Sequence, residues 1–224
     1  MKLEGLIRIY LVDDHPVFRL GLAGLLRAEP KMQLEGETDS GRQALEEIPS
    51  KKIDIVVLDL SLQDMSGLDL IRELRREKKD DFSILVLSMH DEDVFAERAL
   101  KLGADGYLMK NTAPVDILHA IRQIARKEVA LSKRQSDLML KRILGRGSHN
   151  GDSPLQSLSD RELEVFELVG HGKSTRIVAE KLFISVKTVE THQAHIKRKL
   201  GLSNHAELMR SAFAWINELN PSIT

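Results

Sequence analysis

Five polar side chains stand where short apolar runs end in the first half of the chain. They are Asp13, Asp14, Asp59, Ser88 and Lys110. Three carboxylates held close together repel one another and raise one another's pKa unless a cation neutralises them. Mg²⁺ suits such a cluster, because it prefers carboxylate, water and phosphate oxygens. The ammonium and the hydroxyl would then bind the oxygens of a phosphoryl group, so these residue types predict phosphoryl chemistry.

The apolar runs are predicted to be the strands that position these side chains. Continuous runs such as IVVL and ILVL are typical of strands buried on both faces of a sheet. Strand and helix alternate five times, which predicts an α/β fold with a doubly wound, five-stranded parallel sheet. The binding crevice of such a sheet lies beyond the carboxyl ends of its strands, where the five side chains would meet. The expected strands cover 6–12, 32–37, 53–58, 84–88 and 106–109, and the expected helices cover 16–27, 41–48, 67–77, 92–102 and 114–127.

After residue 128 the pattern changes. An amphipathic helix is expected at 132–144, followed by a Gly, Ser and Asn cluster that ends in a proline at 145–154 and is typical of a linker. No strand-like run follows, and helices are expected at 159–169, 174–182, 186–200 and 204–218. We therefore expect an α/β domain at 1–128, a linker helix and flexible linker at 129–157, and a small all-α domain at 158–224.

Composition and charge separate the two halves further. Residues 1–128 carry 19 Lys and Arg against 24 Asp and Glu, whereas residues 129–224 carry 14 against 10. A basic end is compatible with a polyanionic partner. The absence of cysteine excludes disulfides and thiolate chemistry. No apolar run approaches the roughly 20 residues that span a bilayer, and the N-terminus has no signal-peptide pattern, so we expect a cytoplasmic protein without a membrane partner.

The segment 174–200 has the pattern of a helix, a short turn and a second helix. Ser185 is placed to cap the second helix, and Val189, Gln193 and Ile196 share an inward stripe. The opposite stripe is polar and slim enough to enter the major groove of duplex DNA, and basic residues at 197–199 are suited to phosphates. The predicted DNA contacts are Lys187, Thr188, Glu190, Thr191, Ala194, His195, Arg198 and Lys199.

Four motifs in the first half resemble the receiver domain of two-component response regulators. They are LVDDH at 11–15, DLSLQDMSGLDLI at 59–71, VLSMHDED at 86–93 and GADGYLMKN at 103–111. The resemblance implies that Asp59 accepts a phosphoryl group from a histidine kinase and that Lys110 pairs with it. It also implies that Ser88 turns inward to the phosphoryl group and that Tyr107 follows as a switch aromatic. The implied Mg²⁺ ligands are Asp13, Asp14, Asp59 and the backbone carbonyl of Ser61. Gln63 departs from the proline that is usual in this loop.

Residues 158–202 are similar to the LuxR-type helix-turn-helix, with departures at Thr175 and Glu190. The two resemblances together imply a response regulator of the NarL/FixJ class. Such a protein is a phosphorylation-dependent, DNA-binding regulator of transcription, is a homodimer when phosphorylated, and is not a turnover enzyme. Its implied partners are a cognate histidine kinase and duplex promoter DNA.

Two other functions fit parts of the pattern. A phosphohydrolase with an aspartyl nucleophile also places Asp at a strand end, but the haloacid-dehalogenase type expects a second Asp where this chain has Ser61. A receiver whose helical domain binds a protein or RNA is the other alternative. An aromatic content of 4% disfavours RNA, and salt-dependent binding to duplex DNA would separate these functions.

Overall fold

The computed structural model describes residues 5–77, 81–144 and 154–219. The chain divides into two compact units, residues 1–147 and 148–224. The linker predicted at 145–154 lies outside the described residues except for Pro154. In the part of the chain that is described, no helix has the length and apolar character needed to cross a bilayer.

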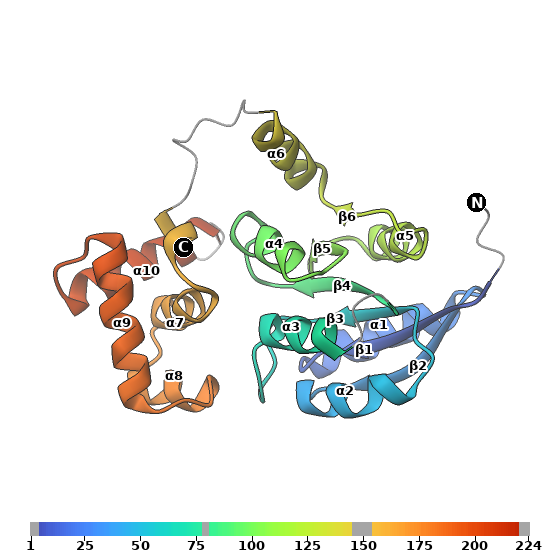
Figure 1. Ribbon diagram of the computed structural model, residues 1–224, viewed down its shortest axis with the longest axis horizontal. Helices are drawn as coiled ribbons and strands as arrows, with labels where there is room; N and C mark the ends of the chain where they lie inside the picture. Colours follow the sequence, from blue (N-terminus) through green and yellow to red (C-terminus); the bar gives the residue numbers. More distant parts are fainter. Residues whose placement is uncertain (1–4, 78–80, 145–153, 220–224) are drawn as a thin grey trace. The chain divides into compact units, whose positions relative to one another are not determined.

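The described part of the first unit is built on a parallel sheet of six strands, in the order β2-β1-β3-β4-β5-β6 (Figure 1). β1 lies between β2 and β3, so the direction of winding reverses between β1 and β3. The predicted doubly wound α/β fold is therefore confirmed. The strands are β1 (Ile7–Val12), β2 (Met32–Thr38), β3 (Ile55–Leu58), β4 (Ser83–Ser88), β5 (Gly106–Met109) and β6 (Ala130–Leu131).

The sixth strand is the one difference from the predicted five-stranded sheet. β6 has two residues, which pair with Gly106 and Tyr107 of β5. Gly106 permits this approach, because a Cβ there would lie 2.6 Å from the carbonyl oxygen of Ala130. Lys127 adopts a φ of 63° in the turn that leads into β6. A strand of two residues has no periodicity, which is why the sequence pattern does not reveal it.

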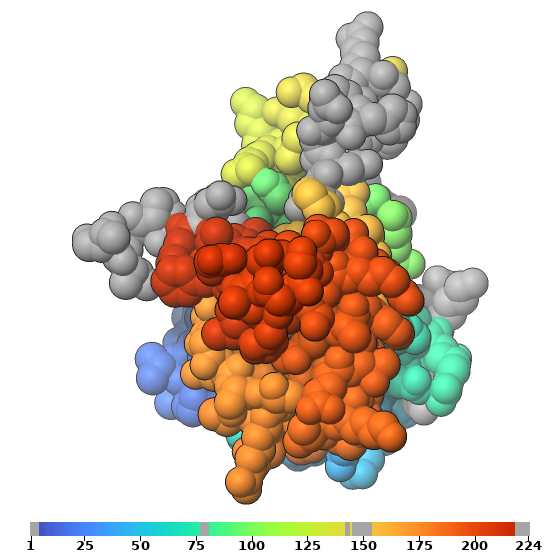
Figure 2. Space-filling view, turned by 90° about the vertical axis from the view of Figure 1, so that its left-hand side faces the viewer, coloured from blue at the N-terminus to red at the C-terminus, as the bar shows by residue number. Residues whose placement is uncertain are grey.

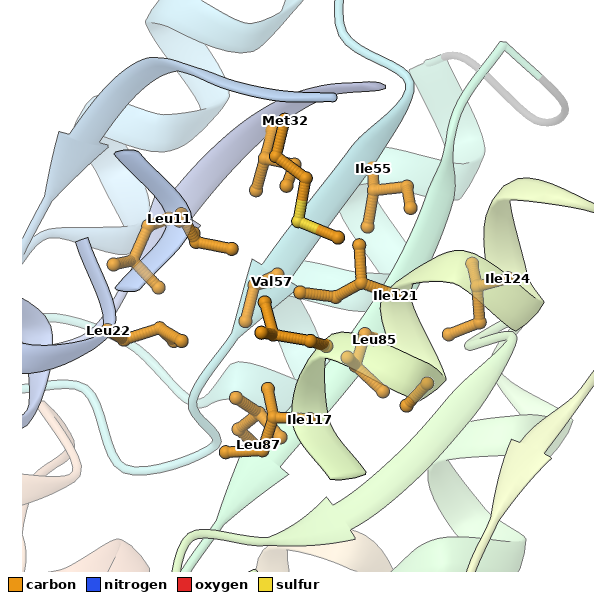
Figure 3. Close-up of a cluster of buried hydrophobic side chains, with 14 of the residues drawn as sticks. Leu11, Leu22, Met32, Ile55, Val57, Leu85, Leu87, Ile117, Ile121 and Ile124 are labelled. Carbon is orange, nitrogen blue, oxygen red and sulfur yellow. The ribbon is translucent and has the colours of Figure 1, made fainter. Parts of the chain in front are cut away.

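Helices α1 (Pro16–Ala28) and α5 (Pro114–Ala125) cover one face of the sheet. Their apolar side chains form a core with alternate residues of the strands, including Leu11, Val57 and Leu85 (Figure 3). The intervening strand residues face the opposite side. There Tyr10 donates a hydrogen bond to Glu47 of α2, and α3 contacts both α2 and α4. These helices are α2 (Gly41–Glu47), α3 (Gly67–Glu77) and α4 (Glu92–Lys101).

Helix α6 (Lys133–Ile143) follows β6 directly and is tied to the first turn of α4. Ser132 caps α6 and donates a hydrogen bond to Glu92 at 3.0 Å. Asp93 accepts hydrogen bonds from Arg134 and from the buried Gln135. The helix predicted at 132–144 is thus present, and it belongs to the first compact unit.

The described part of the second unit consists of helices and a short 3-10 turn at Pro154–Ser157. Ser159 and Glu162 form the predicted capping box at the start of α7, and Ser174 and Ser185 cap the next two helices. Gly201 ends α9 with a φ of 67°. Phe166, Val178, Val189, Ile196 and Leu208 are buried in this unit. The helices are α7 (Asp160–Gly170), α8 (Thr175–Lys181), α9 (Val186–Leu200) and α10 (His205–Leu219).

Candidate functional site

The first candidate site lies at the carboxyl ends of the central strands. Val12 at the end of β1 pairs with Leu58 at the end of β3, and the amide of Asp59 donates to the carbonyl of Val12 at 2.9 Å. Asp13 and Asp59, the residues that follow, therefore lie next to each other. Lys110 follows β5 and reaches both, so the structure brings together the predicted residues Asp13, Asp14, Asp59 and Lys110.

Lys110 connects the two central carboxylates. Its Nζ lies 2.8 Å from Oδ2 of Asp13 and 2.7 Å from Oδ2 of Asp59. All three residues are buried. Nζ also lies 4.7 Å from the centre of the Phe18 ring. Buried charges of this kind are stable only when they are paired and hydrogen-bonded, and one ammonium here faces three nearby carboxylates.

The carboxylates have unused capacity to bind a cation. Oδ1 of Asp59 and Oδ1 of Asp14 are buried and accept no hydrogen bond from the described residues. Burial raises the pKa of Asp13 and of Asp14, and the charge of Asp59 adds to both effects. Ligand atoms of Asp13, Asp14, His15 and Asp59 all lie within 4.8 Å of one another. This oxygen-rich donor set fits a hard divalent cation.

His15 is a residue of the crevice that the sequence analysis missed. Its Nδ1 lies 3.0 Å from Oδ1 of Asp14 and 3.1 Å from Nζ of Lys110, and its side chain is half exposed at the mouth of the site. The available signal was its position directly after Asp13 and Asp14. The sequence does not indicate which way the side chain of a single histidine points. The backbone at the start of α1 directs this ring towards the carboxylates.

The predicted switch residues Ser88 and Tyr107 meet at His90. The backbone amide of His90 donates to the Ser88 hydroxyl at 3.2 Å, and the Tyr107 hydroxyl donates to the His90 carbonyl at 2.8 Å. Nε2 of His90 lies 2.8 Å from Oγ of Ser61. Ser88 and Tyr107 are buried. His90 therefore joins the loop after Asp59 to the loop after β4.

Asp64 anchors the loop that follows Asp59. Its carboxylate accepts hydrogen bonds from the hydroxyl of Ser40 at 2.7 Å and from the backbone amides of Gly41 and Arg42, both at 2.9 Å. The loop between β3 and α3 is thus fixed to the start of α2. The neighbouring Gln63 stands where the family usually has a proline, and in this chain the side chain of Asp64 anchors the loop.

The second candidate site is the outer face of α9. This helix lies on the face of the second unit that Figure 2 shows, in its orange-red colours. Its residues Lys187, Glu190, Thr191, Ala194 and Arg198 are exposed. Val189, Gln193 and Ile196 are buried, so the predicted division of this helix into an inward and an outward stripe is confirmed. Thr188 lies at the edge, where its hydroxyl is 2.7 Å from that of Ser185.

His195 and Lys199, the other two predicted DNA contacts, lie against α7. Nζ of Lys199 donates to Oε2 of Glu162 at 2.6 Å, and Nδ1 of His195 lies 3.5 Å from Oε1 of the same carboxylate. The sequence indicated Glu162 only as part of a capping box. Its contact with a residue 37 positions later depends on how α7 and α9 pack.

Comparison with known proteins assigns a family to each unit. The response regulator receiver domain family matches residues 9–122, and the family described as bacterial regulatory proteins, luxR family, matches residues 156–212. The chain belongs to the response regulators. The transcriptional regulatory protein UhpA of Escherichia coli (strain K12) is 34% identical to this response regulator over 93% of the chain and 98% of its own length.

Further relatives agree with this assignment. The nitrate/nitrite response regulator protein NarL of Escherichia coli (strain K12) is 33% identical over 94% of each chain. RcsB from Salmonella enterica serovar Typhimurium, bound to promoter P1flhDC in the presence of phosphomimetic BeF₃⁻, has a TM-score of 0.69 at 25% identity and covers 96% of this chain and 98% of its own. This response regulator is a transcription regulator of a two-component system, with a receiver followed by a LuxR-type DNA-binding unit.

Proposed function

We propose that this response regulator accepts a phosphoryl group on Asp59 from a histidine kinase and then binds promoter DNA through α9. The observation that carries the proposal is the state of the Asp59 carboxylate. It is buried, one oxygen accepts a hydrogen bond from Lys110, and the other has no donor among the described residues. An ionised carboxylate with a free oxygen beside a cation is a competent nucleophile.

Each neighbour of Asp59 has a proposed part in phosphoryl transfer. A bond forms between an Asp59 oxygen and phosphorus, the bond from phosphorus to the kinase histidine breaks, and the imidazole leaves with the electron pair. Lys110 pairs with the Asp59 carboxylate and can move its ammonium onto a phosphoryl oxygen, which neutralises the added charge. Asp13, Asp14, Asp59 and the backbone carbonyl of Ser61 would hold Mg²⁺, which when bound supplies positive charge for the phosphoryl oxygens.

Ser88 and Tyr107 are the proposed switch. A phosphoryl group on Asp59 adds acceptor oxygens and up to two negative charges to the crevice. The Ser88 hydroxyl now accepts from His90, and we propose that it turns to donate to the phosphoryl group instead. The hydrogen bond from Tyr107 to the His90 carbonyl must then adjust, because it is made to the same loop.

For DNA binding we propose the outward stripe of α9. The stripe residues that would contact bases or phosphates are Lys187, Thr188, Glu190, Thr191, Ala194 and Arg198. A polar helix face of this kind fits the major groove, and a homodimer would read two half-sites about one helical turn apart. His195 and Lys199 are left out of this stripe, because both contact Glu162 of α7.

The wider assignments belong to the same proposal. The receiver would comprise residues 1–128, the linker 129–157 and the DNA-binding domain 158–224. The protein would modify itself in one stoichiometric step rather than act as a turnover enzyme. Since chromosomal DNA and the phosphorylated domain of a kinase lie in the cytoplasm of a bacterium, the protein would act there.

Labelling with acetyl phosphate, followed by measurement of DNA binding, tests the proposal. Asp59→Asn is expected to abolish labelling and the gain in affinity for promoter DNA, and EDTA is expected to abolish both in the unsubstituted protein. Asp137→Asn, which changes an exposed carboxylate on α6, is the matched control and should label normally. Undiminished labelling of Asp59→Asn would contradict the assignment of the phosphoacceptor.

A further inference from the structure

Glu162 is a buried carboxylate between α7 and α9 whose contacts extend beyond its own helix. It is 4% exposed. Oε2 accepts hydrogen bonds from the backbone amide of Ser159 at 2.7 Å and from Nζ of Lys199 at 2.6 Å. A buried carboxylate is strongly destabilising without a cationic partner. Lys199, with a side chain that is 34% exposed, is the cation that satisfies this one.

The contacts of Glu162 hold one side of α9. Residues 195 and 199 are four apart, so they lie one turn apart on the same side of the helix, and the carboxylate contacts both side chains. The apolar side of α9 is held by the burial of Val189 and Ile196. Successive residues of a helix point about 100° apart. A rotation of α9 about its axis by a fraction of that angle would therefore turn Glu190 and Thr191 away from their present direction.

The same contact changes the charge that α9 offers to DNA. Three basic residues end the helix, Lys197, Arg198 and Lys199. Arg198 is exposed, whereas the charge of Lys199 is balanced by Glu162 within hydrogen-bond distance. Only an uncompensated cation releases a full counterion equivalent when it meets a phosphate. Arg198 and Lys199, although adjacent in the sequence, should therefore contribute differently to DNA binding.

We propose that Glu162 is a positioning residue for DNA recognition: it sets the rotation of α9 through Lys199 and His195, and it withholds the charge of Lys199 from the DNA phosphates. This inference rests on the proposed function, in which α9 reads duplex DNA. It assigns specificity to a side chain on α7 that lies beneath the reading helix.

Three substitutions in the full chain separate this role from a general effect on folding. Glu162→Gln removes the charge but keeps the capping box, because glutamine also serves at this position. The double variant Glu162→Gln with Lys199→Met removes both members of the pair and leaves no buried charge alone. Arg198→Met is the matched control for an exposed cation. Trp215 is the only tryptophan of the chain, and the centre of its ring lies 5.7 Å from that of Phe166. Its fluorescence therefore reports whether each variant is folded.

The readout is the affinity of the phosphorylated protein for target and for random duplex DNA over a series of salt concentrations. Arg198→Met is expected to lower the slope of log affinity against log salt by about one. The double variant is expected to keep the slope of the unsubstituted protein, because the pair it removes is neutral. Glu162→Gln is expected to steepen the slope by about one, because it frees Lys199, and to lower the ratio of target to random affinity about tenfold.

Two results would overturn the inference. A slope that falls in the double variant as much as in Arg198→Met would show that Lys199 contacts phosphate independently of Glu162. An unchanged ratio of target to random affinity in folded Glu162→Gln would show that Glu162 does not position the reading helix. Binding of the unsubstituted protein that does not depend on salt would instead contradict the proposed function, and this inference with it.

Discussion

Asp14 is the residue of the crevice that is most clearly suited to binding a cation at the expense of the stability of the folded protein. Burial raises the pKa of its carboxyl, and the charges of Asp59 and Asp13 add to this effect, although His15 opposes it. Its Oδ1 is buried and accepts no hydrogen bond of good geometry from the described residues, although Nδ1 of His15 lies 3.0 Å away. Residues held in this way are common where a site is completed by a ligand, and they usually destabilise the empty protein.

Asp14→Asn is therefore expected to raise the free energy of unfolding in EDTA by about 0.5–2 kcal/mol. It should also remove most of the stabilisation by Mg²⁺, which for the unsubstituted protein would be about 2.7 kcal/mol at a concentration of 100 Kd. The measurement is urea denaturation with EDTA or MgCl₂, with Asp137→Asn as the control. A variant that is less stable than the unsubstituted protein in EDTA would contradict this account of Asp14.

The dependence of this effect on pH has a definite sign. Folding raises the pKa of Asp14, so the folded state binds the proton more tightly than the unfolded chain. The destabilisation by Asp14 is therefore present at neutral pH and disappears as the pH falls through the raised pKa towards the unfolded value of about 3.9. The gain from Asp14→Asn should shrink over the same range.

Glu190 stands on the exposed stripe of α9 and can accept a hydrogen bond from the amino group of a cytosine. We expect Glu190→Ala to change which base is preferred at one position of the site, by about 1–3 kcal/mol. Selection of bound sequences from a randomised duplex measures this, with Glu180→Ala on α8 as the control. A uniform change in affinity for all sequences would mean that Glu190 does not face a base.

At the scale of elements, the loop after β3 depends on the hydrogen bonds of one side chain. Asp64 joins this loop to the start of α2 through Ser40, Gly41 and Arg42. Burial would raise the pKa of Asp64, but these hydrogen bonds outweigh it and lower the pKa. The stabilisation by Asp64 is thus present above the unfolded value of about 3.9 and is lost as the pH falls through the lowered one.

Asp64→Ala is expected to lower the free energy of unfolding by about 1.5–3 kcal/mol, the range for hydrogen bonds to a charged group. The same loop carries Ser61, so the affinity for Mg²⁺ should also fall. Denaturation by urea and titration calorimetry with MgCl₂ measure the two effects. Asp69→Ala, which breaks a partly exposed ion pair with Arg72 on α3, should leave both nearly unchanged.

The elements differ in how far the sequence predicts them. Five strands and the helices appear within a few residues of their predicted bounds, because buried parallel strands and amphipathic helices have strong periodicity. The polar residues that converge in the crevice were found because parallel strands all end at one edge of the sheet. The approach of His15 to Lys110 and the pairing of Glu162 with Lys199 were not predicted, since side-chain contacts between distant elements depend on packing that periodicity does not encode.

At the scale of the whole molecule, the second unit has a core of its own. Phe166, Val178, Val189, Ile196 and Leu208 are buried. A fragment of residues 150–224 is therefore expected to fold alone. We further expect it to bind promoter DNA more tightly than the unphosphorylated full chain, on the hypothesis that the receiver masks α9 until it is phosphorylated. Gel-shift assays with the fragment and with the full chain, before and after phosphorylation, test this. If the fragment binds no better than the unphosphorylated full chain, masking is wrong and phosphorylation acts through dimerisation.

The attachment of α6 to α4 also bears on how such chains are recombined. The matched receiver family ends at residue 122, yet Ser132, Arg134 and Gln135 bond to the first turn of α4. A chimera in which a foreign receiver replaces residues 1–128 would keep α6 but lose Glu92 and Asp93 of α4, with which α6 forms hydrogen bonds. Exchange of sensory inputs, in the laboratory or in evolution, should therefore succeed more readily when the junction lies beyond residue 144, so that α6 travels with its receiver.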